Sequence, residues 1–168
     1  VSTNYVLRFS SGLLATVDSS NVTVTAGTAS KLAFTTQPSS STVAGVAFST
    51  QPVVTVQDAN GNTVTGSTAS IALTLTTGAG ALGGTATMNA VNGVANFSGK
   101  NLSINLVGAD KVLTASSSGL TAATTSPAFT IIAGTATTIA VNAGNGQSAT
   151  AGSAVATDPS VLVTDANG

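Results

Sequence analysis

The sequence predicts an all-β protein built from copies of one sandwich, and three observations carry this prediction. Positions 107 residues apart match, such as Gly27 and Gly134; 42% of the 168 residues are hydrophobic while 5% are charged; and short alternating apolar runs are separated by turn signals. A disordered polar tract lacks this much apolar surface, so the chain is expected to fold. Val, Thr, Gly and Asn are abundant, which favours strands and tight turns.

The repeat extends through the whole chain. Segment 27–61 aligns with segment 134–168 without a gap, and the run Asp-Ala-Asn-Gly at 58–61 recurs at 165–168. Gly12-Leu13 also matches Gly119-Leu120, with a one-residue slip earlier in the chain. A fixed period is typical of an array in which each unit is one structural module.

The repeat divides the chain into three expected domains. Residues 1–26 are the C-terminal part of one repeat, residues 27–133 are a complete repeat, and residues 134–168 are the N-terminal part of a following repeat. Pieces as short as the two incomplete copies rarely bury enough apolar surface to fold alone. The polypeptide is therefore expected to continue in both directions with further copies.

About seven strands are expected in the complete copy. Alternating apolar residues place them near 31–36, 43–50, 52–58, 70–76, 85–91, 94–104 (interrupted near Gly99) and 111–116, with 121–131 as a closing strand or part of an eighth. The Asn60-Gly61 and Asn92-Gly93 pairs are hairpin signals, because both residue types tolerate the positive φ of a type I′ turn. This pattern predicts an immunoglobulin-like antiparallel β-sandwich, repeated in tandem.

The repeat also indicates which strand face is buried. Val54 and Val56 keep their apolar character 107 residues later, whereas Thr55 between them does not keep its polar one, so the alternating set is expected inside. The predicted core consists of Leu32, Phe34, Val54, Val56, Leu73, Leu75, Leu113, Phe129 and Ile131.

Three segments carry a resemblance to a known family. The runs KLAFTTQP at 31–38, VTVQDANGN at 54–62 and VNGVANF at 91–97 resemble the bacterial immunoglobulin-like tandem repeats of large surface proteins and adhesins, including the invasin and intimin type. The resemblance covers all three copies. It implies a structural stalk or filament at the bacterial cell surface or outside the cell, whose partners are neighbouring repeats of the same polypeptide and, in a fibre, other copies.

Charge and hydropathy argue against two classes of partner. Four basic residues and a net charge of −1 do not build an electrostatic footprint for nucleic acid. No apolar run approaches the roughly 18 residues of a membrane-spanning helix, so no direct membrane insertion is expected in this segment.

One motif leaves two interpretations open. Asp58, Asn60 and Asn62 are spaced like the first three ligands of a calcium loop. The EF-hand loop, however, has Gly at its sixth position and Glu at its twelfth, whereas here Gly61 is fourth and the chain contains no Glu. The preferred interpretation is that Asp58 accepts backbone N–H bonds in a turn. No metal and no cofactor is therefore predicted.

The inventory for catalysis is small, and the chain is not predicted to be an enzyme. It has no His, Cys or Glu, and a paired-carboxylate mechanism needs two of Asp18, Asp58, Asp110, Asp158 and Asp165. Asp58 and Asp165 are the same position in successive copies, which indicates module geometry. Lys31 is the candidate for an internal Lys–Asn bond of the kind that locks some surface repeats, but its alternation with Leu32 and Phe34 predicts a solvated lysine.

Two alternative functions and one modification remain open. The chain is alternatively a carbohydrate- or host-protein-binding module that acts through loops 77–84 and 105–110, or a self-assembling sheath or fibre subunit. The triplets that begin at Asn21, Asn96 and Asn101 match the N-glycosylation pattern.

Overall fold

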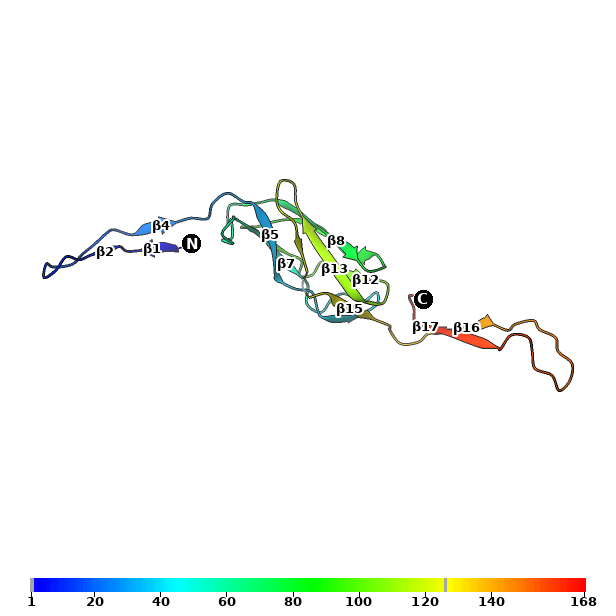
Figure 1. Cartoon of the computed structure of the whole chain (residues 1–168). Coiled ribbons are helices and arrows are strands. Elements are labelled where there is room, and N and C mark those ends of the chain that lie inside the picture. Colours follow the sequence, from blue (N-terminus) through cyan, green and yellow to red (C-terminus); the bar gives the residue numbers. More distant parts are fainter. Residues whose placement is uncertain (1, 126) are drawn as a thin grey trace.

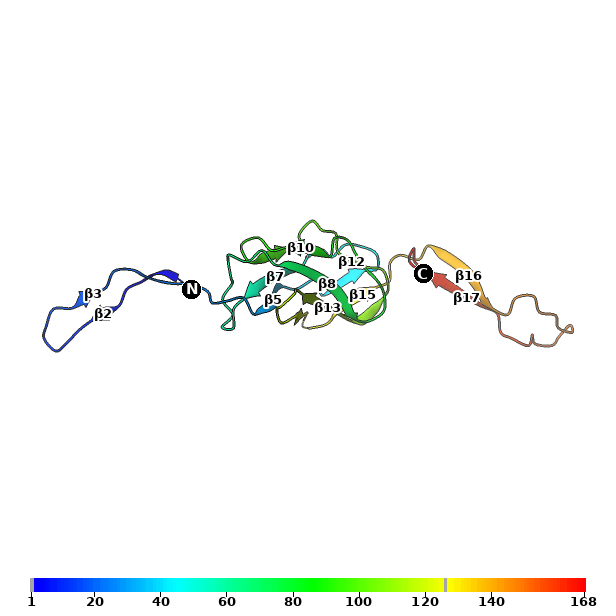
Figure 2. The same ribbon diagram turned by 90° about the horizontal axis from the view of Figure 1, so that it is seen from above.

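The computed structural model describes residues 2–125 and 127–168, and within them every regular element is a strand. The all-β prediction is confirmed. The described residues contain no helix long and apolar enough to cross a membrane. We call residues 2–26 the N-terminal segment, residues 27–133 the central segment and residues 134–168 the C-terminal segment. Two long hairpins extend from opposite ends of the central segment, so that the three segments follow one another in an elongated molecule (Figures 1 and 2).

The central segment contains two main sheets. Its strands are β5 (Lys31–Thr36), β6 (Ser41–Val43), β7 (Val53–Gln57), β8 (Ser70–Thr77), β9 (Leu82–Gly83), β10 (Thr87–Asn89), β11 (Val94–Asn96), β12 (Ser103–Ile104), β13 (Gly108–Ser116), β14 (Ala123–Thr124) and β15 (Phe129–Ile132). One sheet has the order β10-β8-β13-β15-β6, with β14 also paired to β13, and the other has the order β11-β7-β5. A separate pair joins β12 and β9. These pairings are antiparallel except for β15 with β6, which is parallel.

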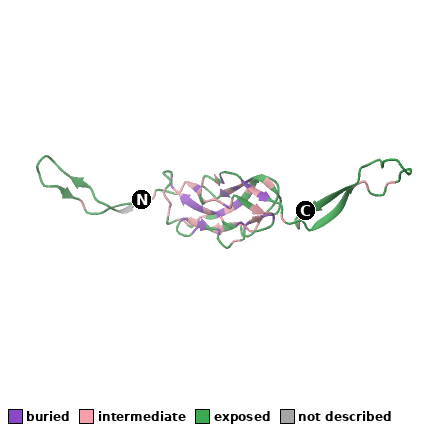
Figure 3. Ribbon diagram, turned by 90° about the horizontal axis from the view of Figure 1, so that it is seen from below, coloured by how far each residue is buried: buried purple, intermediate pink, exposed green. Residues whose placement is uncertain are grey.

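The two sheets share one hydrophobic core. Val54 and Val56 on β7 pack in the same cluster as Leu113 on β13, and all three are fully buried. Buried residues are concentrated in the central segment (Figure 3). Seven of the predicted core residues are buried, namely Leu32, Val54, Val56, Leu73, Leu113, Phe129 and Ile131, while Phe34 and Leu75 are partly buried and pack against the core.

Two details of the predicted strands are wrong. Residues 43–50 were expected to form a strand, but β6 ends at Val43 and the chain then turns, because Val46 N–H donates to the Val43 carbonyl and Gly45 adopts a φ of +75°. Thr55 was expected on an exposed face but is buried. Its strand is central in its sheet, and the Gln57 side chain lies against it, with the Gln57 amide donating to the Thr55 hydroxyl. The expected interruption near Gly99 is confirmed, since it separates β11 from β12.

The two Asn-Gly pairs form different turns. At Asn92-Gly93 both residues have positive φ, and Val91 and Val94 exchange backbone hydrogen bonds, as a type I′ hairpin requires. At Asn60-Gly61 only Gly61 has positive φ, and its N–H donates to the Asp58 carbonyl. The predicted type I′ geometry is therefore wrong at this second pair.

The C-terminal segment repeats part of the central segment residue for residue. Its strands β16 (Thr138–Ala143) and β17 (Ser160–Thr164) pair as Thr138 with Thr164 and Val141 with Val161. Both partners of each pair lie 107 positions after those of the β5–β7 ladder, and the ladder irregularity after Phe34 recurs after Val141. The local sequence therefore specifies the same register twice.

The N-terminal segment consists of two short ladders, β1 (Ser2–Tyr5) with β4 (Val22–Val24) and β2 (Arg8–Phe9) with β3 (Val17–Asp18). The β1–β4 irregularity between Ser2 and Tyr5 matches the one between Gly108 and Lys111 on β13. Ser2 and Tyr5 lie 106 positions before Gly108 and Lys111, and the residues of β2 and β3 lie 106 positions before their counterparts on β13 and β14. Val22, in contrast, lies 107 positions before Phe129. The one-residue slip therefore lies between Asp18 and Val22, not before Gly12.

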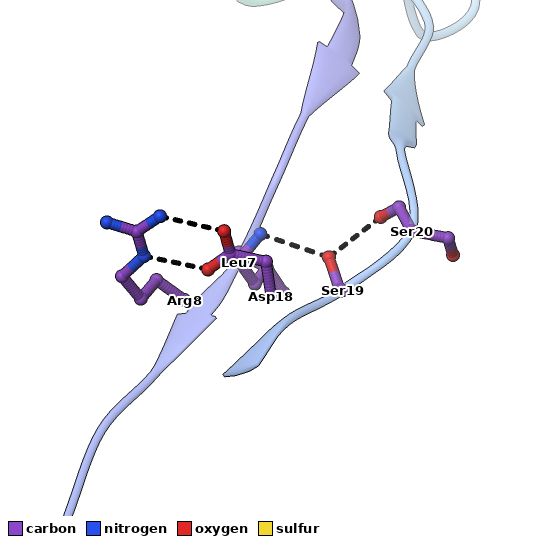
Figure 4. Close-up of polar contacts among 5 residues, drawn as sticks. All are labelled: Leu7, Arg8, Asp18, Ser19 and Ser20. Atoms are coloured by element: carbon purple, nitrogen blue, oxygen red, sulfur yellow. Dashed lines mark hydrogen bonds and ion pairs between the residues drawn. The ribbon is translucent and has the colours of Figure 1, made fainter. Parts of the chain in front are cut away.

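An exposed ion pair closes this hairpin. The Arg8 guanidinium binds both carboxylate oxygens of Asp18, at 2.7 and 2.8 Å, and Leu7 N–H donates to the Ser19 hydroxyl (Figure 4). The hydrogen bond from Arg8 holds the pKa of Asp18 below its ordinary value. Both side chains are well exposed, so this pair orients the hairpin more than it stabilises it.

Candidate functional site at the aspartate turns

The Asp58 carboxylate organises the turn that follows β7. Its Oδ1 accepts the N–H groups of Asn60 and Asn62, at 3.0 and 2.9 Å. Its Oδ2 accepts the Gly27 N–H at 2.8 Å and the Asn62 side-chain amide at 3.0 Å. One buried side chain therefore joins a turn to the residue at which the central segment begins.

These donors favour the ionised carboxylate. The Asn62 side chain makes the largest contribution and the Gly27 N–H the next, and together with the other backbone donors they lower the pKa of Asp58 to about 2, against the opposing effect of desolvation. The carboxylate remains charged at any pH near neutrality, and its charge is balanced by N–H dipoles.

The same arrangement recurs in the C-terminal segment. Asp165 Oδ2 accepts the Gly134 N–H at 2.7 Å, and its Oδ1 accepts the Asn167 N–H at 2.9 Å. The Gly134 bond is the first cause of a lowered pKa at Asp165. Each Asp-Ala-Asn-Gly turn thus fixes the glycine 31 residues before its aspartate.

The second turn also contacts the central segment. The Asn167 side-chain amide donates to the Ala44 carbonyl at 3.0 Å, in the loop after β6. A Cβ added at Gly45 would lie 2.9 Å from Asn167 Oδ1, so that only glycine leaves room for this side chain without a shift. A Cβ at Gly134 would lie 3.3 Å from Val43 Cγ1. Residues 43–45, Gly134 and the turn at 165–168 therefore meet at one point, which we call the joint.

The turn interpretation of Asp58, Asn60 and Asn62 accounts for the observed contacts. Both Asp58 oxygens accept N–H donors, and the Asn62 side chain turns its amide nitrogen toward them. A calcium ligand set requires the oxygens to face a common cation. Among the described residues no three Asp side chains gather as a metal-binding group.

The structure places Lys31 at the surface turn and buries a different lysine, Lys111. Lys31 Nζ donates to the Ala59 carbonyl at 3.2 Å, on the outside of the turn. Lys111, which the sequence did not single out, is only 1% exposed, and its Nζ donates to the carbonyls of Ala79 and Val107 at 2.5 and 3.1 Å. The neighbouring Gly78 and Gly108 would have offered the signal, because a Cβ at either would strike the Lys111 side chain.

The loops proposed for binding lie side by side. Lys111 bridges loop 77–84 to loop 105–110, and Asn105 Oδ1 accepts the Ala81 N–H at 2.7 Å. Leu106 and Val107 in the second loop are 40% and 52% exposed. The two loops therefore form one surface with a modest apolar component.

The remaining predicted residues lie at separate places. Asp18 binds Arg8, and Asp58 and Asp165 occupy equivalent turns, so these three carboxylates have structural partners. Asp110 and Asp158 are exposed. The glycosylation triplets begin at exposed asparagines, Asn21, Asn96 and Asn101.

Comparisons with known proteins give little. No protein-family model matches the chain, and no curated protein matches it either. Two crystal structures of the β-glucuronidase of Parabacteroides merdae, one with glycerol in its active site, are similar to part of the chain, with 18% identity and a TM-score of 0.42. The match covers 66% of this chain but only 13% and 14% of those enzyme chains. A likeness of this size carries no inference about activity.

Proposed function

We propose that this chain is a segment of a structural stalk or filament, made of immunoglobulin-like sandwiches in tandem and belonging to a bacterial extracellular or cell-surface protein. The observation that carries the proposal is the recurrence, 107 residues apart, of both the β5–β7 ladder and the aspartate turn that pins the preceding glycine. The segments follow one another along the molecule (Figure 1), which is the arrangement a stalk requires.

The exposed faces of the two hairpins support further copies. Ile139 and Val163 are 69% and 56% exposed, whereas their counterparts Leu32 and Val56 are 4% and 0% exposed. A shallow hollow of about 320 Å³, lined in part by Val141, Pro159 and Val161, lies on the C-terminal hairpin at positions whose counterparts adjoin the central core. We infer that each hairpin belongs to a sandwich whose other strands are the remainder of that same copy of the repeat.

The recurring site supports a structural role over a catalytic one. Both aspartates of the turns use their oxygens to hold backbone N–H groups, which serves geometry and occupies both carboxylates. The low charge of the chain likewise gives no electrostatic funnel toward a charged substrate. The proposed partners are neighbouring repeats of the same polypeptide and, in a fibre, other copies.

The test is a series of polypeptides that contain one, two and three consecutive copies of residues 27–133. If the copies form a stalk, the maximum dimension from small-angle X-ray scattering increases linearly with copy number, and electron micrographs show single rods. A maximum dimension that grows only as a compact particle would contradict the proposal. Micrographs of the native assembly then separate isolated stalks from a laterally packed sheath.

The binding-module alternative rests on the joined loops 77–84 and 105–110. Because Lys111 and Asn105 hold these loops together, they form a preorganised surface that carries the exposed Leu106 and Val107. Binding of the 168-residue chain to a glycan or host-protein array, lost on Leu106→Asp but kept in Leu162→Asp, would favour this alternative. Leu162 is a comparably exposed leucine on the C-terminal hairpin, at 53% against 40% for Leu106.

A further inference from the structure

We propose that the Asp-Ala-Asn-Gly turn at 58–61 is an interaction surface for another copy of this repeat, whose loop equivalent to residues 43–45 presents a backbone carbonyl to Asn60. The proposal rests on the tandem arrangement proposed above and adds to it the residues that fix successive copies relative to one another. The Asn167 contact with Ala44 is the same joint in its occupied form.

The acceptor side of the joint is a fixed loop. Ala44 is buried, its N–H donates to the Ile132 carbonyl at 2.9 Å, and the Gly45 N–H donates to the Ile104 carbonyl at 2.8 Å. Both bonds hold the loop against strands at the end of the core from which the chain leaves. The Ala44 carbonyl is therefore presented in one direction, ready to accept a hydrogen bond.

The donor side is equally constrained. Asp165 holds the Gly134 N–H at 2.7 Å, so the link between the segments and the turn that carries Asn167 form one unit. Gly134 packs close to Val43, so this link has little room to move. A hydrogen bond between two such constrained groups fixes an orientation in addition to the covalent connection.

The chain displays both halves of the same joint without an occupant. Asn60, the counterpart of Asn167, is exposed, and its side chain makes no hydrogen bond with the described residues, although Asp58 shapes its turn in the same way. Gly152, the counterpart of Gly45, keeps a φ of +85°, and nothing lies within 4 Å of a Cβ added there, whereas Gly45 has Asn167 against it. Asn60 is thus a donor without an acceptor loop, and the loop at Gly152 is an acceptor loop without an asparagine. A further copy of the repeat supplies the missing partner in each case.

The experiment uses the 168-residue chain with two spin labels, at Thr87→Cys on the central segment and Ala149→Cys on the C-terminal segment, both exposed positions in a chain without cysteine. Double electron–electron resonance then measures the distribution of distances between them. Asn167→Ala is expected to broaden the distribution about twofold, because segments joined only by a link move relative to each other. Asn60→Ala, the matched control, leaves it unchanged. Equal distributions for the parent chain and Asn167→Ala would overturn the proposal.

A second matched pair separates the joint from backbone strain. Gly45→Ala and Gly152→Ala introduce the same side chain at the same left-handed conformation, but only the first meets Asn167. Broadening in Gly45→Ala alone supports the joint, and equal behaviour of both variants contradicts it. Circular dichroism confirms that the central segment remains folded in each case.

The final arm replaces residues 1–26 with a complete copy of residues 27–133, so that residue 133 of the first copy is followed directly by Gly27 of the second. Asn60→Ala is then expected to broaden the distance distribution between the two complete copies, as Asn167→Ala does in the 168-residue chain. No broadening would overturn the assignment of Asn60. The two proposals can be contradicted separately. A compact particle in the multi-copy scattering series contradicts the stalk, whatever the distance distribution of Asn167→Ala. A maximum dimension that grows linearly, together with an unchanged distance distribution in Asn167→Ala, contradicts the joint alone.

Discussion

The central and C-terminal segments share one ladder and differ in what covers it. The β5–β7 and β16–β17 pairs have the same register and the same irregularity, yet Val54 is fully buried and its counterpart Val161 is 59% exposed. The difference teaches that hairpin register is a property of the local sequence, whereas burial depends on strands such as β8 and β13 from distant parts of the chain. Substitutions at equivalent positions of the two segments separate the effects of local sequence from those of the covering strands.

The largest expected difference concerns Leu32 and Ile139, the same position in the two ladders. Leu32→Ala should lower the free energy of unfolding of the central segment by about 2–5 kcal/mol, because it leaves a cavity in a closed core. Ile139→Ala, at a position 69% exposed, should change it by less than about 0.5 kcal/mol. Urea unfolding followed by circular dichroism measures both, and equal effects would show that the two segments share one cooperative core.

Phe34→Ala should lower the free energy of unfolding by less than the same substitution of a fully buried phenylalanine would, because Phe34 is only partly buried.

Lys111 gives a smaller and more local effect. Lys111→Met keeps the apolar stem and removes the Nζ that donates to Ala79 and Val107, so we expect a loss of about 1–3 kcal/mol. Amide hydrogen exchange should rise in loops 77–84 and 105–110 and remain unchanged in β16 and β17. The ladder-equivalent Tyr5 on the N-terminal segment is 48% exposed, so Tyr5→Met is the control that leaves the central segment unaffected. Unchanged exchange in the loops would contradict the bridging role.

The two aspartate turns should respond differently to acid. Because the folded pKa of Asp58 is about 2, below the ordinary value of 3.8, its contribution to stability is complete above about pH 4 and is lost as the pH falls through about 2. Asp58→Asn should remove this part of the pH dependence in thermal unfolding. Asp165→Asn should leave the unfolding of the central segment unchanged and raise the exchange of the Gly134 and Asn167 amides, which the carboxylate accepts. A pH profile unaffected by Asp58→Asn would disprove the assignment.

The smallest expected effect is that of a chelator. If Asp58 serves only the turn, EDTA should leave the melting temperature of the chain unchanged. A fall of several degrees that calcium reverses would instead show that Asp58, Asn60 and Asn62 bind the ion. Measuring Asp58→Asn in parallel separates a site at this turn from one elsewhere.

Sequence reasoning succeeded where the interaction is local or repeated. The alternating set at Val54 and Val56 predicted a buried face, and Asn92-Gly93 predicted its turn, because each depends on a few adjacent residues. The prediction of a strand at 43–50 failed because the loop there is fixed by hydrogen bonds to Ile104 and Ile132, which are far away in sequence.

The candidate site was predicted in part. The sequence indicated that Asp58 shapes a turn, since the run recurs at 165–168. It did not indicate that the carboxylate holds Gly27 or that Asn167 reaches Ala44, because both contacts join residues 31 or more positions apart. The recurrence of Asn60 as Asn167 was the available signal, and it was interpreted only as part of the turn.

The parallel pairing of β6 with β15 has a mechanical consequence. The chain enters the central segment before β6 and leaves it directly after β15, at opposite ends of that segment (Figure 2). A pull along the chain therefore drives these two strands past each other in opposite directions. Their hydrogen bonds, including Thr130 N–H to Ser40 and Ala44 N–H to Ile132, are strained together instead of opening one after another. We therefore expect the β6–β15 pair to resist stretching of the central segment along the chain direction.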